Sequence, residues 1–532
     1  RSNERLQKAL NGGFGMEWFL DPTLTWTNSV GFRTSKGNNP TDTYYDNYFT
    51  DGTPSFIRYR LNVEDDKDTN IRFGTNLVKK FNNDGHELRF DASVSRSIDD
   101  ENSNISDYNL GTPIFTNSIE RTKNNQDEKR SLIQADYVLP FSKDSRFEAG
   151  YRGSFSELDT DARAESLQAG VWVNNPNYTN YLEYKEYINA FYSQYGSKLG
   201  KFSYLLGLRW EDSNIDVNVV SADDYNKKRY NNFFPSAFLT YEFSESNNLS
   251  LSYSRRINRP RGRFLTPFSG LESNINIFTG NPDLNPSMTN AFDIGYLKKW
   301  KSVTLSSSAY VNVTDNSFQF VRRTETRNVN GSPAIVTLTT PINLSKEYRF
   351  GFEFNVNYTP FKWWRINSNF NFFRNQTKGD YTFTYQDLSN NTFTDFQDFN
   401  RTAYTWTIRV NNKVTLPGKI DWQLNGNYEG PQNTAQGKRR GVASANTSLS
   451  KDVLKDKATI GLNVQDIFNS RKMKNETFLP GDLSSYSEMQ WRRRQVTLSF
   501  TYRFNMTKSD RQKEQQKQRE NQDGGGDEYM GG

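Results

Sequence analysis

Few residues in this sequence are of a type that supports covalent chemistry. The 532 residues include no cysteine and a single histidine, His86. Without cysteine there are no disulfides, thiol nucleophiles or cysteine-ligated metals, and one histidine cannot build an HExxH zinc site. Serine and aspartate are abundant, but a hydrolase triad also needs a base placed beside its nucleophile. We therefore expect a protein that is not an enzyme, with no catalytic residues and no cofactor.

An aromatic run near the N-terminus is a candidate binding surface. It lies within the stretch 34–68, whose polar composition predicts a long loop, and aromatic side chains in such a loop have no core to fill. They could stack against a ligand, contact a partner protein or pack the loops together. The candidate residues are Tyr44, Tyr45, Tyr48 and Phe49.

A second candidate surface lies in the stretch 257–286, where phenylalanines follow a cluster of arginines. The arginines could attract an anionic substrate or the phosphate groups of lipopolysaccharide, or they could be solvated charge without a partner. The candidate residues are Arg261, Arg263, Phe264 and Phe268, with Arg255, Arg256, Arg259 and Phe278 nearby.

The acidic run Glu64-Asp65-Asp66-Lys67-Asp68 contains oxygen ligands of the kind that calcium prefers. It lacks the regular spacing of a calcium-binding loop, so we expect no metal site. Charge is mixed along the whole chain, with 67 basic and 61 acidic residues and a net charge of +6. Because no basic stripe stands out, we expect no nucleic-acid partner.

The elements that must position these residues follow from a period-two alternation of apolar and polar side chains. It runs through residues 350–358, 404–410, 420–428 and 496–504. Successive side chains of a strand face opposite sides, so each segment has one apolar and one polar face. The residues that we place on a lipid-facing side are Phe352, Phe354, Trp406, Ile408, Trp422, Leu424, Phe500 and Tyr502.

Composition indicates what the apolar faces meet. Hydrophobic residues make up 34% of the chain and aromatic residues 15%, and the mean hydropathy is -0.86. A soluble sandwich of about 19 such strands would need a large aliphatic core, which this composition does not supply. In a closed membrane barrel the apolar face meets lipid and the polar face meets a wet lumen. The sequence therefore predicts an all-β fold, a large antiparallel transmembrane β-barrel.

Short turns and long polar stretches follow one another along the chain. The turns lie at 21–23, 82–85, 142–145, 245–247 and 417–419, and the long stretches at 34–68, 99–127, 157–179, 218–229, 257–286, 376–399 and 471–488. Outer-membrane barrels have short periplasmic turns and long extracellular loops. We expect a barrel over 1–505 that lacks its first strands, and a disordered periplasmic tail over 506–532.

Several motifs resemble those of TonB-dependent receptor barrels, in particular the outer-membrane β-barrel subfamily typical of Bacteroidota. The motif Gly280-Asn281-Pro282-Asp283-Leu284-Asn285-Pro286 is followed by NAFDIGY at 290–296. The runs NFFPS at 232–236 and YSRRINRP at 253–260 fit the same pattern. The resemblance covers essentially all of 8–505.

The resemblance implies a barrel of about 22 strands with a plug inside it that the energy-coupling protein TonB pulls. No plug is found here, and about three strands fewer are counted. The predicted function is that of a receptor of the TonB-dependent type in the bacterial outer membrane, which takes up a nutrient through a plugged barrel. The alternative is an accessory subunit of an assembly or secretion complex, which transports nothing. A plug encoded upstream of Arg1 would favour transport.

The resemblance also bears on partners and on assembly. Expected partners are outer-membrane lipid and lipopolysaccharide, TonB through a plug, and a surface lipoprotein or other subunits of an outer-membrane complex. Tyr502 and Phe504 resemble the terminal aromatic signal that the outer-membrane assembly machinery reads, and Phe504 should lie at the periplasmic interface. We expect this last strand to pair with the first and so remove both edges of the sheet.

Overall fold

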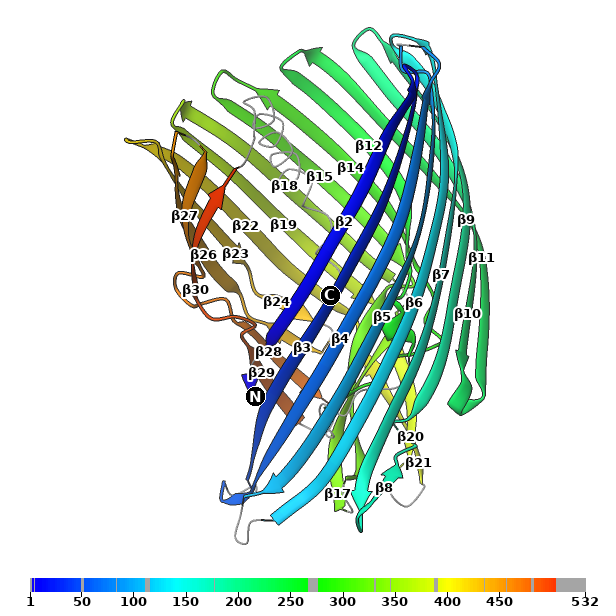
Figure 1. Cartoon of the computed structure of the whole chain (residues 1–532), viewed down its shortest axis with the longest axis vertical. Coiled ribbons are helices and arrows are strands. Elements are labelled where there is room, and N and C mark those ends of the chain that lie inside the picture. Colours follow the sequence, from blue (N-terminus) through cyan, green and yellow to red (C-terminus); the bar gives the residue numbers. More distant parts are fainter. Residues whose placement is uncertain are drawn as a thin grey trace.

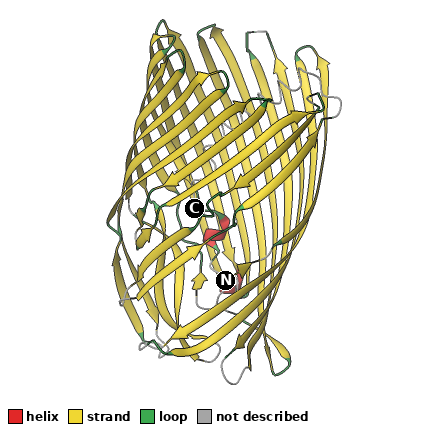
Figure 2. Ribbon diagram, turned by 90° about the vertical axis from the view of Figure 1, so that its left-hand side faces the viewer, coloured by secondary structure: helices red, strands yellow, loops and turns green. Residues whose placement is uncertain are grey.

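The computed structural model shows an antiparallel sheet that curves around a central space (Figure 2). The structure describes residues 2–3, 5–48, 52–82, 84–110, 115–176, 178–266, 276–329, 332–344, 346–386, 391–434, 436–455, 457–479 and 483–503. Among these residues no helix is long and apolar enough to cross a membrane.

The main sheet has 21 strands, and all of them except the short strands β1 (Ser2–Asn3) and β8 (Val171–Asn174) form the barrel wall. The wall strands, in pairing order, are β2 (Leu6–Asp21), β3 (Leu24–Tyr48), β4 (Pro54–Lys80), β5 (Glu87–Asn109), β6 (Phe115–Ser142), β7 (Ser145–Gln168), β9 (Asn180–Leu199), β10 (Phe202–Val219), β11 (Asp224–Ser244), β12 (Asn247–Asn258), β14 (Ser287–Lys299), β15 (Val303–Asp315), β18 (Lys346–Phe361), β19 (Trp364–Lys378), β22 (Arg401–Leu416), β23 (Ile420–Glu429), β26 (Val442–Val453), β27 (Ala458–Gln465) and β30 (Gln495–Tyr502). The predicted fold class and the count of about 19 strands are confirmed.

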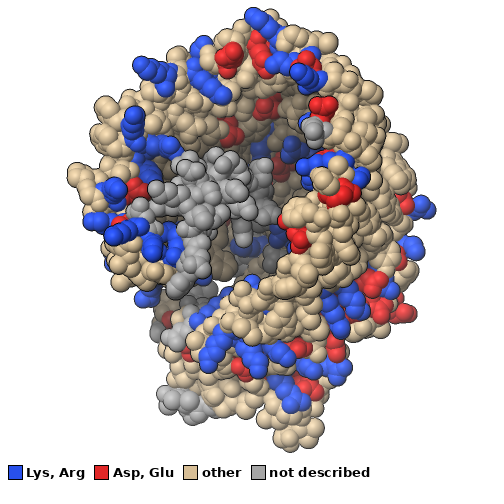
Figure 3. Space-filling model, turned by 45° about the horizontal axis from the view of Figure 1, so that its top comes forward, with Lys and Arg blue, Asp and Glu red and all other residues tan. Residues whose placement is uncertain are grey.

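The pairing register brings the apolar side chains of neighbouring strands onto one face of the wall. One such row crosses four strands and consists of Phe354, Phe370, Ile408 and Tyr428. The adjacent row on the opposite face consists of Asn355, Asn369, Arg409 and Asn427. One apolar face and one polar face are what a wall between lipid and water requires. Viewed from the short-turn end, the molecule is hollow, with charged side chains of both signs around the opening (Figure 3).

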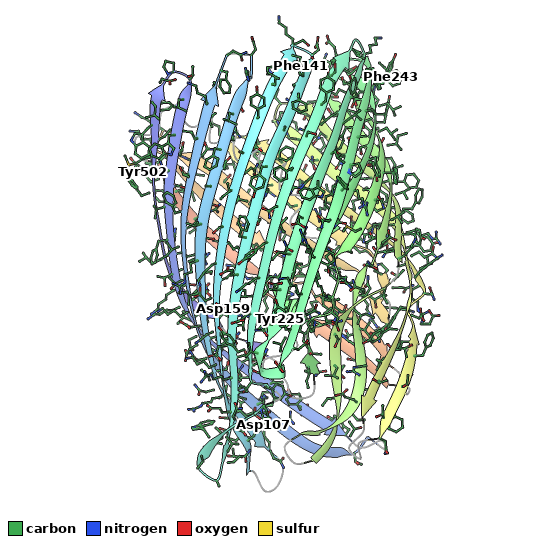
Figure 4. All side chains as sticks on the ribbon, turned by 90° about the vertical axis from the view of Figure 1, so that its right-hand side faces the viewer. Asp107, Phe141, Asp159, Tyr225, Phe243 and Tyr502 are labelled. Atoms are coloured by element: carbon green, nitrogen blue, oxygen red, sulfur yellow. The ribbon has the colours of Figure 1, made fainter. Side chains whose placement is uncertain are left out.

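The tight turns at 21–23, 142–145, 245–247 and 417–419 lie together at one end of the barrel, whereas the tight turn between β7 and β8 lies at the other end. Phe141 and Phe243, beside two of the four turns, lie at the end that these turns share, and Asp107 lies at the opposite one (Figure 4). In the turn between β22 and β23, Gly418 and Lys419 have positive φ angles of 78° and 58°. The ladder of β22 and β23 closes at Leu416 and Ile420, so this turn contains three residues, and left-handed residues let such short hairpin loops match the twist of their strands. The two ends are called the short-turn end and the long-loop end below.

Four stretches predicted as long loops, 34–68, 99–127, 157–179 and 218–229, are mainly strand, so those predictions were wrong. β3 and β4 pair without a break from Leu24 and Lys79 to Asn47 and Phe56. β5 and β6 likewise run through most of 99–127, β7 and the short strand β8 through most of 157–179, and β10 and β11 through most of 218–229. Polar residues ended the apolar alternation in the sequence, but the backbone ladder continues because every strand still has a neighbour to pair with.

The other long connections form small sheets at the long-loop end (Figure 1). One contains β13 (Asn276–Phe278), β16 (Phe318–Val329) and β17 (Ser332–Asn343); a second contains β20 (Asp380–Gln386) and β21 (Thr392–Asp398); a third contains β24 (Gln432–Thr434), β25 (Gly437–Arg439), β28 (Met473–Leu479) and β29 (Leu483–Met489). The helix α1 (Gly262–Leu265) lies in the same connection as β13, and the 3₁₀ turn η1 (Val220–Ala222) lies between β10 and β11.

An apolar core lies on the inner face of β9 and β10 at the long-loop end. Ile215, Val217 and Val219 are buried there, whereas Leu206 and Leu208 on the same strand are exposed on the other face. The apolar positions of β10 therefore change from even to odd numbers along the strand. Because alternate residues face opposite sides, this change marks the level at which apolar packing moves from the outside of the wall to its inside.

The predicted pairing of the last strand with the first is not found among the described residues. β2 and β30 each pair on one side, with β3 and β27, and Figure 1 shows them apart. Both strands run toward the short-turn end, so an antiparallel ladder cannot join them directly. Residues along both strands are exposed, among them Phe14 and Leu498 at 67% and 75%.

Candidate ligand-binding site

A cavity of about 1020 Å³ opens inside the wall at the long-loop end. One side is the inner face of β5, β6, β7 and β9, which contributes Glu101, Asn124, Thr160 and Asn180. The other side is built by the segments between wall strands that carry α1, β13, β16, β24, β25 and β28. Residues from eight or more separate segments of the chain therefore meet around one space.

Three phenylalanine rings form the apolar side of this cavity. Phe264 and Phe320 meet edge to face with 5.1 Å between ring centroids, and Phe278 lies 6.3 Å from Phe264 and 6.1 Å from Phe320. Phe264 is 5% exposed because it also packs on the inner core of β9 and β10. Aromatic pairs of this geometry add about 0.5–1.5 kcal/mol beyond their buried area. The rings thus give the cavity a rigid apolar surface.

Charged side chains of both signs lie around the same space. Arg322 donates a hydrogen bond of 2.8 Å to the hydroxyl of Thr477, and Arg163 pairs with Asp161 at 3.1 Å. Lys123 and Lys438 also line the cavity, and neither makes an ion pair within the described part of the chain. Two unpaired ammonium groups make the cavity suited to a ligand that carries negative charge.

One side chain ties the cavity-forming segments together. The amide oxygen of Gln436 accepts a hydrogen bond of 2.7 Å from the backbone N–H of Arg322, and its amide nitrogen donates one of 2.6 Å to the Arg322 carbonyl. The same nitrogen donates to the side-chain oxygen of Gln397 at 3.0 Å. Gln436 therefore joins three connections that are far apart in the sequence, and this holds β16 in place beside the cavity.

Arg259 anchors the base of the segment that carries Phe264. Its guanidinium lies 2.6 Å from a carboxylate oxygen of Glu211 and donates to the hydroxyl of Ser213 at 2.8 Å. The Arg259 side chain is only 17% exposed. Solvated charge, one of the two interpretations of this cluster, is therefore wrong for Arg259, because its charge is satisfied by the barrel wall.

The structure places the other members of the arginine cluster differently. Arg261 is exposed just before α1 and does not line the cavity, whereas Phe264 does. The side chain of Arg263 and the whole of Phe268 lie outside the described residues. Phe320 and Gln436 were missed. Phe320 belongs to the run Phe318-Gln319-Phe320 and Gln436 stands just before Lys438-Arg439-Arg440, but neither short run shows which distant segment lies opposite it. No local signal separates them from residues of an ordinary polar loop.

The predicted aromatic surface of Tyr44, Tyr45 and Tyr48 lies on β3, so its assignment to a loop was wrong; Phe49 lies outside the described residues. Tyr44 and Tyr48 are exposed, at 61% and 62%. The Tyr44 ring packs 4.9 Å from Tyr59, and the Arg58 guanidinium lies 4.4 Å over the Tyr45 ring. None of the three lines the cavity. They form a separate aromatic surface at the far tip of the β3–β4 hairpin.

A buried ionic cluster supports this tip. Arg60 is 1% exposed and pairs with Asp107 at 3.2 Å and with Glu120 at 2.7 Å. Asp107 also pairs with Arg58 at 3.3 Å. The hydroxyl of Tyr59 donates a hydrogen bond of 2.6 Å to Asp42, which raises the pKa of Tyr59 to about 12. Such buried charges are costly unless they are paired, so the cluster fixes the hairpins relative to one another.

The acidic run lies on β4, and its members alternate between the two faces of the wall. Glu64 and Asp66 accept hydrogen bonds of 2.9 Å from Asn39. Asp68 lies opposite Asp99 of β5, and burial together with the Asp68 carboxylate raises the pKa of Asp99 to about 6. The described residues contain no group of three or more potential ligands placed to hold a metal ion.

The remaining predicted residues lie at the short-turn end. Tyr502 ends β30, is 40% exposed and pairs with Ala458; Phe504 lies outside the described residues. His86 approaches the hydroxyl of Tyr137 at 2.9 Å and packs against Phe81. These contacts are structural. Among the described residues, no carboxylate or nucleophile forms a hydrogen bond with His86.

Comparison with known proteins places the wall from the end of β4 onward in a defined group. The sequence model of a family described as outer membrane protein beta-barrel matches residues 79–502. No curated protein matches the sequence at a significant level.

Solved structures share the fold. The siderophore receptor PiuA from Acinetobacter baumannii is 11% identical with a TM-score of 0.56, over 93% of this chain and 79% of that one. The ferric-catecholate import receptor Fiu from K12 E. coli is 12% identical with a TM-score of 0.53, over 94% and 81%. The copper transporter OprC is 12% identical with a TM-score of 0.55, over 94% and 80%. At these identities the likeness shows the fold alone.

Proposed function

This chain belongs to the outer membrane protein beta-barrel family, and we propose that within this family it is an uptake receptor. In this proposal it binds a nutrient at the long-loop end and passes it through the barrel. The observation that carries the proposal is the cavity inside the wall, where three phenylalanines in mutual contact face charged and amide side chains. Concave sites with an apolar surface and a few convergent polar groups are the usual form of small-molecule sites.

The proposed direction of uptake follows from the orientation of the wall. Short turns face the periplasm and long loops face outward in barrels of this kind, so the cavity would open to the outside. We further propose that the energy for release comes from TonB acting on a plug. The fold likeness to the siderophore receptors PiuA and Fiu and to the copper transporter OprC supports this proposal.

A second candidate function is that of a subunit in a larger outer-membrane complex. The exposed aromatic surface of Tyr44 and Tyr48 favours it, because this surface lies outside the cavity and beyond the apolar band of the wall. A surface lipoprotein or another complex subunit is the proposed occupant. Uptake through the cavity and docking at this tip are compatible in one molecule.

Uptake is tested by measuring which compounds the cells remove from the growth medium. Cells lacking the native gene are complemented with the full-length protein or a variant, and the spent medium is compared by mass spectrometry. We expect the wild type to deplete a small set of compounds, and Phe320→Ala, which removes a ring from the cavity, to abolish this. Ile335→Ala is the matched control, because Ile335 lies on the partner strand β17 and is 60% exposed.

The same cells separate the two candidate functions. If no compound is depleted by the wild type, and a second protein co-purifies with it in stoichiometric amount, the accessory role replaces uptake. Tyr44→Ser with Tyr48→Ser should then release that protein. If uptake is correct, the tyrosine variants should leave the depletion of the medium unchanged.

A further inference from the structure

A compact corner joins β27 to β28 and β29 to β30, at the border of the apolar wall that faces the long-loop end. Asn469 accepts hydrogen bonds through its side-chain oxygen from the side chain of Gln490 at 2.9 Å and from the backbone N–H of Arg494 at 3.0 Å. Asp466, 5% exposed, accepts backbone hydrogen bonds from Ser470 and Arg471 at 2.9 and 3.0 Å. These contacts hold residues 466–471 and 490–494 side by side in one ordered unit, called the arginine corner below.

The arginine corner carries side chains that no described contact explains. Trp491 is 77% exposed and Phe468 is 74% exposed, which places both among the most exposed large apolar side chains in the described structure. The four arginines of the corner are exposed. They are Arg471, Arg492, Arg493 and Arg494.

The charges of the corner are not compensated by nearby acids. Within the described residues none of its four arginines makes an ion pair, and the guanidinium of Arg494 donates a hydrogen bond of 3.3 Å to the Ile467 carbonyl. The adjacent carboxylate of Glu488 is already paired with Lys472 at 2.8 Å and Lys474 at 3.4 Å. Four guanidinium groups therefore face solvent without a local counter-charge.

The depth of the corner on the wall shows what it faces. β27 and β30 begin their ladder at Gln465 and Gln495, and the outward apolar residues start at the next pair, Val464 and Val496. Arg494 thus lies two residues, or about 7 Å, from the end of the apolar band. Tryptophan and arginine are the side chains that favour the border between lipid tails and headgroups.

From this placement we infer that the arginine corner binds phosphate-bearing lipid headgroups of the leaflet at the long-loop end. Guanidinium groups recognise phosphate oxygens through paired hydrogen bonds as well as charge. The rings of Trp491 and Phe468 would lie at the boundary between lipid tails and headgroups, and the arginines would contact the headgroup phosphates. This role is independent of the proposed uptake and rests only on the orientation of the apolar wall.

The test uses the full-length protein in a neutral detergent and native mass spectrometry with diphosphorylated lipid A as the probe. The variant Arg492→Gln/Arg493→Gln/Arg494→Gln should retain this lipid on the order of 100-fold less well than wild type, given the attraction of each basic residue to an anionic surface. The control Arg96→Gln/Arg121→Gln/Arg130→Gln removes the same charge from arginines that are exposed and paired with acids. It should retain the lipid within about threefold of wild type.

Two further arms identify the source of the phosphate. Dephosphorylated lipid A should not be retained, and inorganic phosphate alone should show no binding by calorimetry. Equal retention by the triple variant and wild type, or equal loss in the control, would overturn the proposal. Tight binding of inorganic phosphate that the triple variant loses would assign the corner to a soluble anion instead. Heat-modifiable migration on gels checks that each variant is folded.

Discussion

Replacement of Ile408 by arginine tests which face of the wall meets lipid. Ile408 belongs to the outward row with Phe370 and Tyr428. It lies six residues from Val414, which pairs with Trp364 and Trp422 near the short turns. Six residues span about 20 Å along a strand, or about 15 Å of depth at the usual tilt of about 40°. Within an apolar band of about 25 Å, Ile408 is therefore close to the midplane.

This depth sets the size of the expected effect. Arginine at the midplane of a barrel costs about 2–4 kcal/mol, which changes a folding equilibrium by on the order of 30- to 1000-fold. The matched control is Thr407→Arg on the neighbouring residue. Thr407 faces the opposite side, between Asn371 and Glu429, so the arginine enters a polar lumen and should cost less than about 1 kcal/mol.

The measurement is the folded fraction in lipid vesicles across a urea series, read from heat-modifiable migration. Ile408→Arg should shift the midpoint to clearly lower urea, and Thr407→Arg should stay near wild type. Equal shifts for the two variants would show that the apolar face does not meet lipid. A larger shift for Thr407→Arg than for Ile408→Arg would show that the face assigned to the lumen meets lipid instead.

Three further outcomes follow from the structure. Arg60→Ala leaves the carboxylate of Glu120 without its ion pair and removes one ion pair of Asp107, which keeps that to Arg58, and should destabilise the β4–β6 tip by about 3–5 kcal/mol in hydrogen exchange. Arg130→Ala, at an exposed pair, should cost less than about 1 kcal/mol. The pKa of Asp99 is raised to about 6 in the folded protein. Ionisation of Asp99 therefore destabilises the folded state by an amount that grows as pH rises from about 4 to 6. Asp99→Asn should therefore raise the melting temperature at pH 8 and have little effect at pH 4; an equal effect at both would exclude this cause. Removal of 508–532 should leave membrane assembly intact and truncation before Gln495 should prevent it, as gels of membrane fractions would show; loss of assembly on trimming the tail alone would make the tail a docking element.

The sequence by itself determined the wall of this protein. Alternation at 350–358 and 404–410 is a local property of consecutive residues, and it states which side chains share a face whatever the partner strand is. The low aliphatic content then excluded a soluble core. The change of apolar parity between Trp210 and Ile215 was also present in the sequence. This change indicates where the strand leaves the membrane, and it was not considered when a loop was predicted at 218–229.

Only the tertiary structure decided the cavity. Phe264, Phe278 and Phe320 meet because two connections fold toward one another. Gln436, in a third connection, is joined to one of them through the backbone of Arg322. The local sequence does not distinguish a phenylalanine that lines the cavity from one that faces lipid. Neither periodicity nor composition shows which residues of a distant segment will lie opposite it. The same reason applies to strand length. The polar stretch at 34–68 looked like a loop, and it is strand because neighbouring strands supply hydrogen-bond partners that no local pattern reveals.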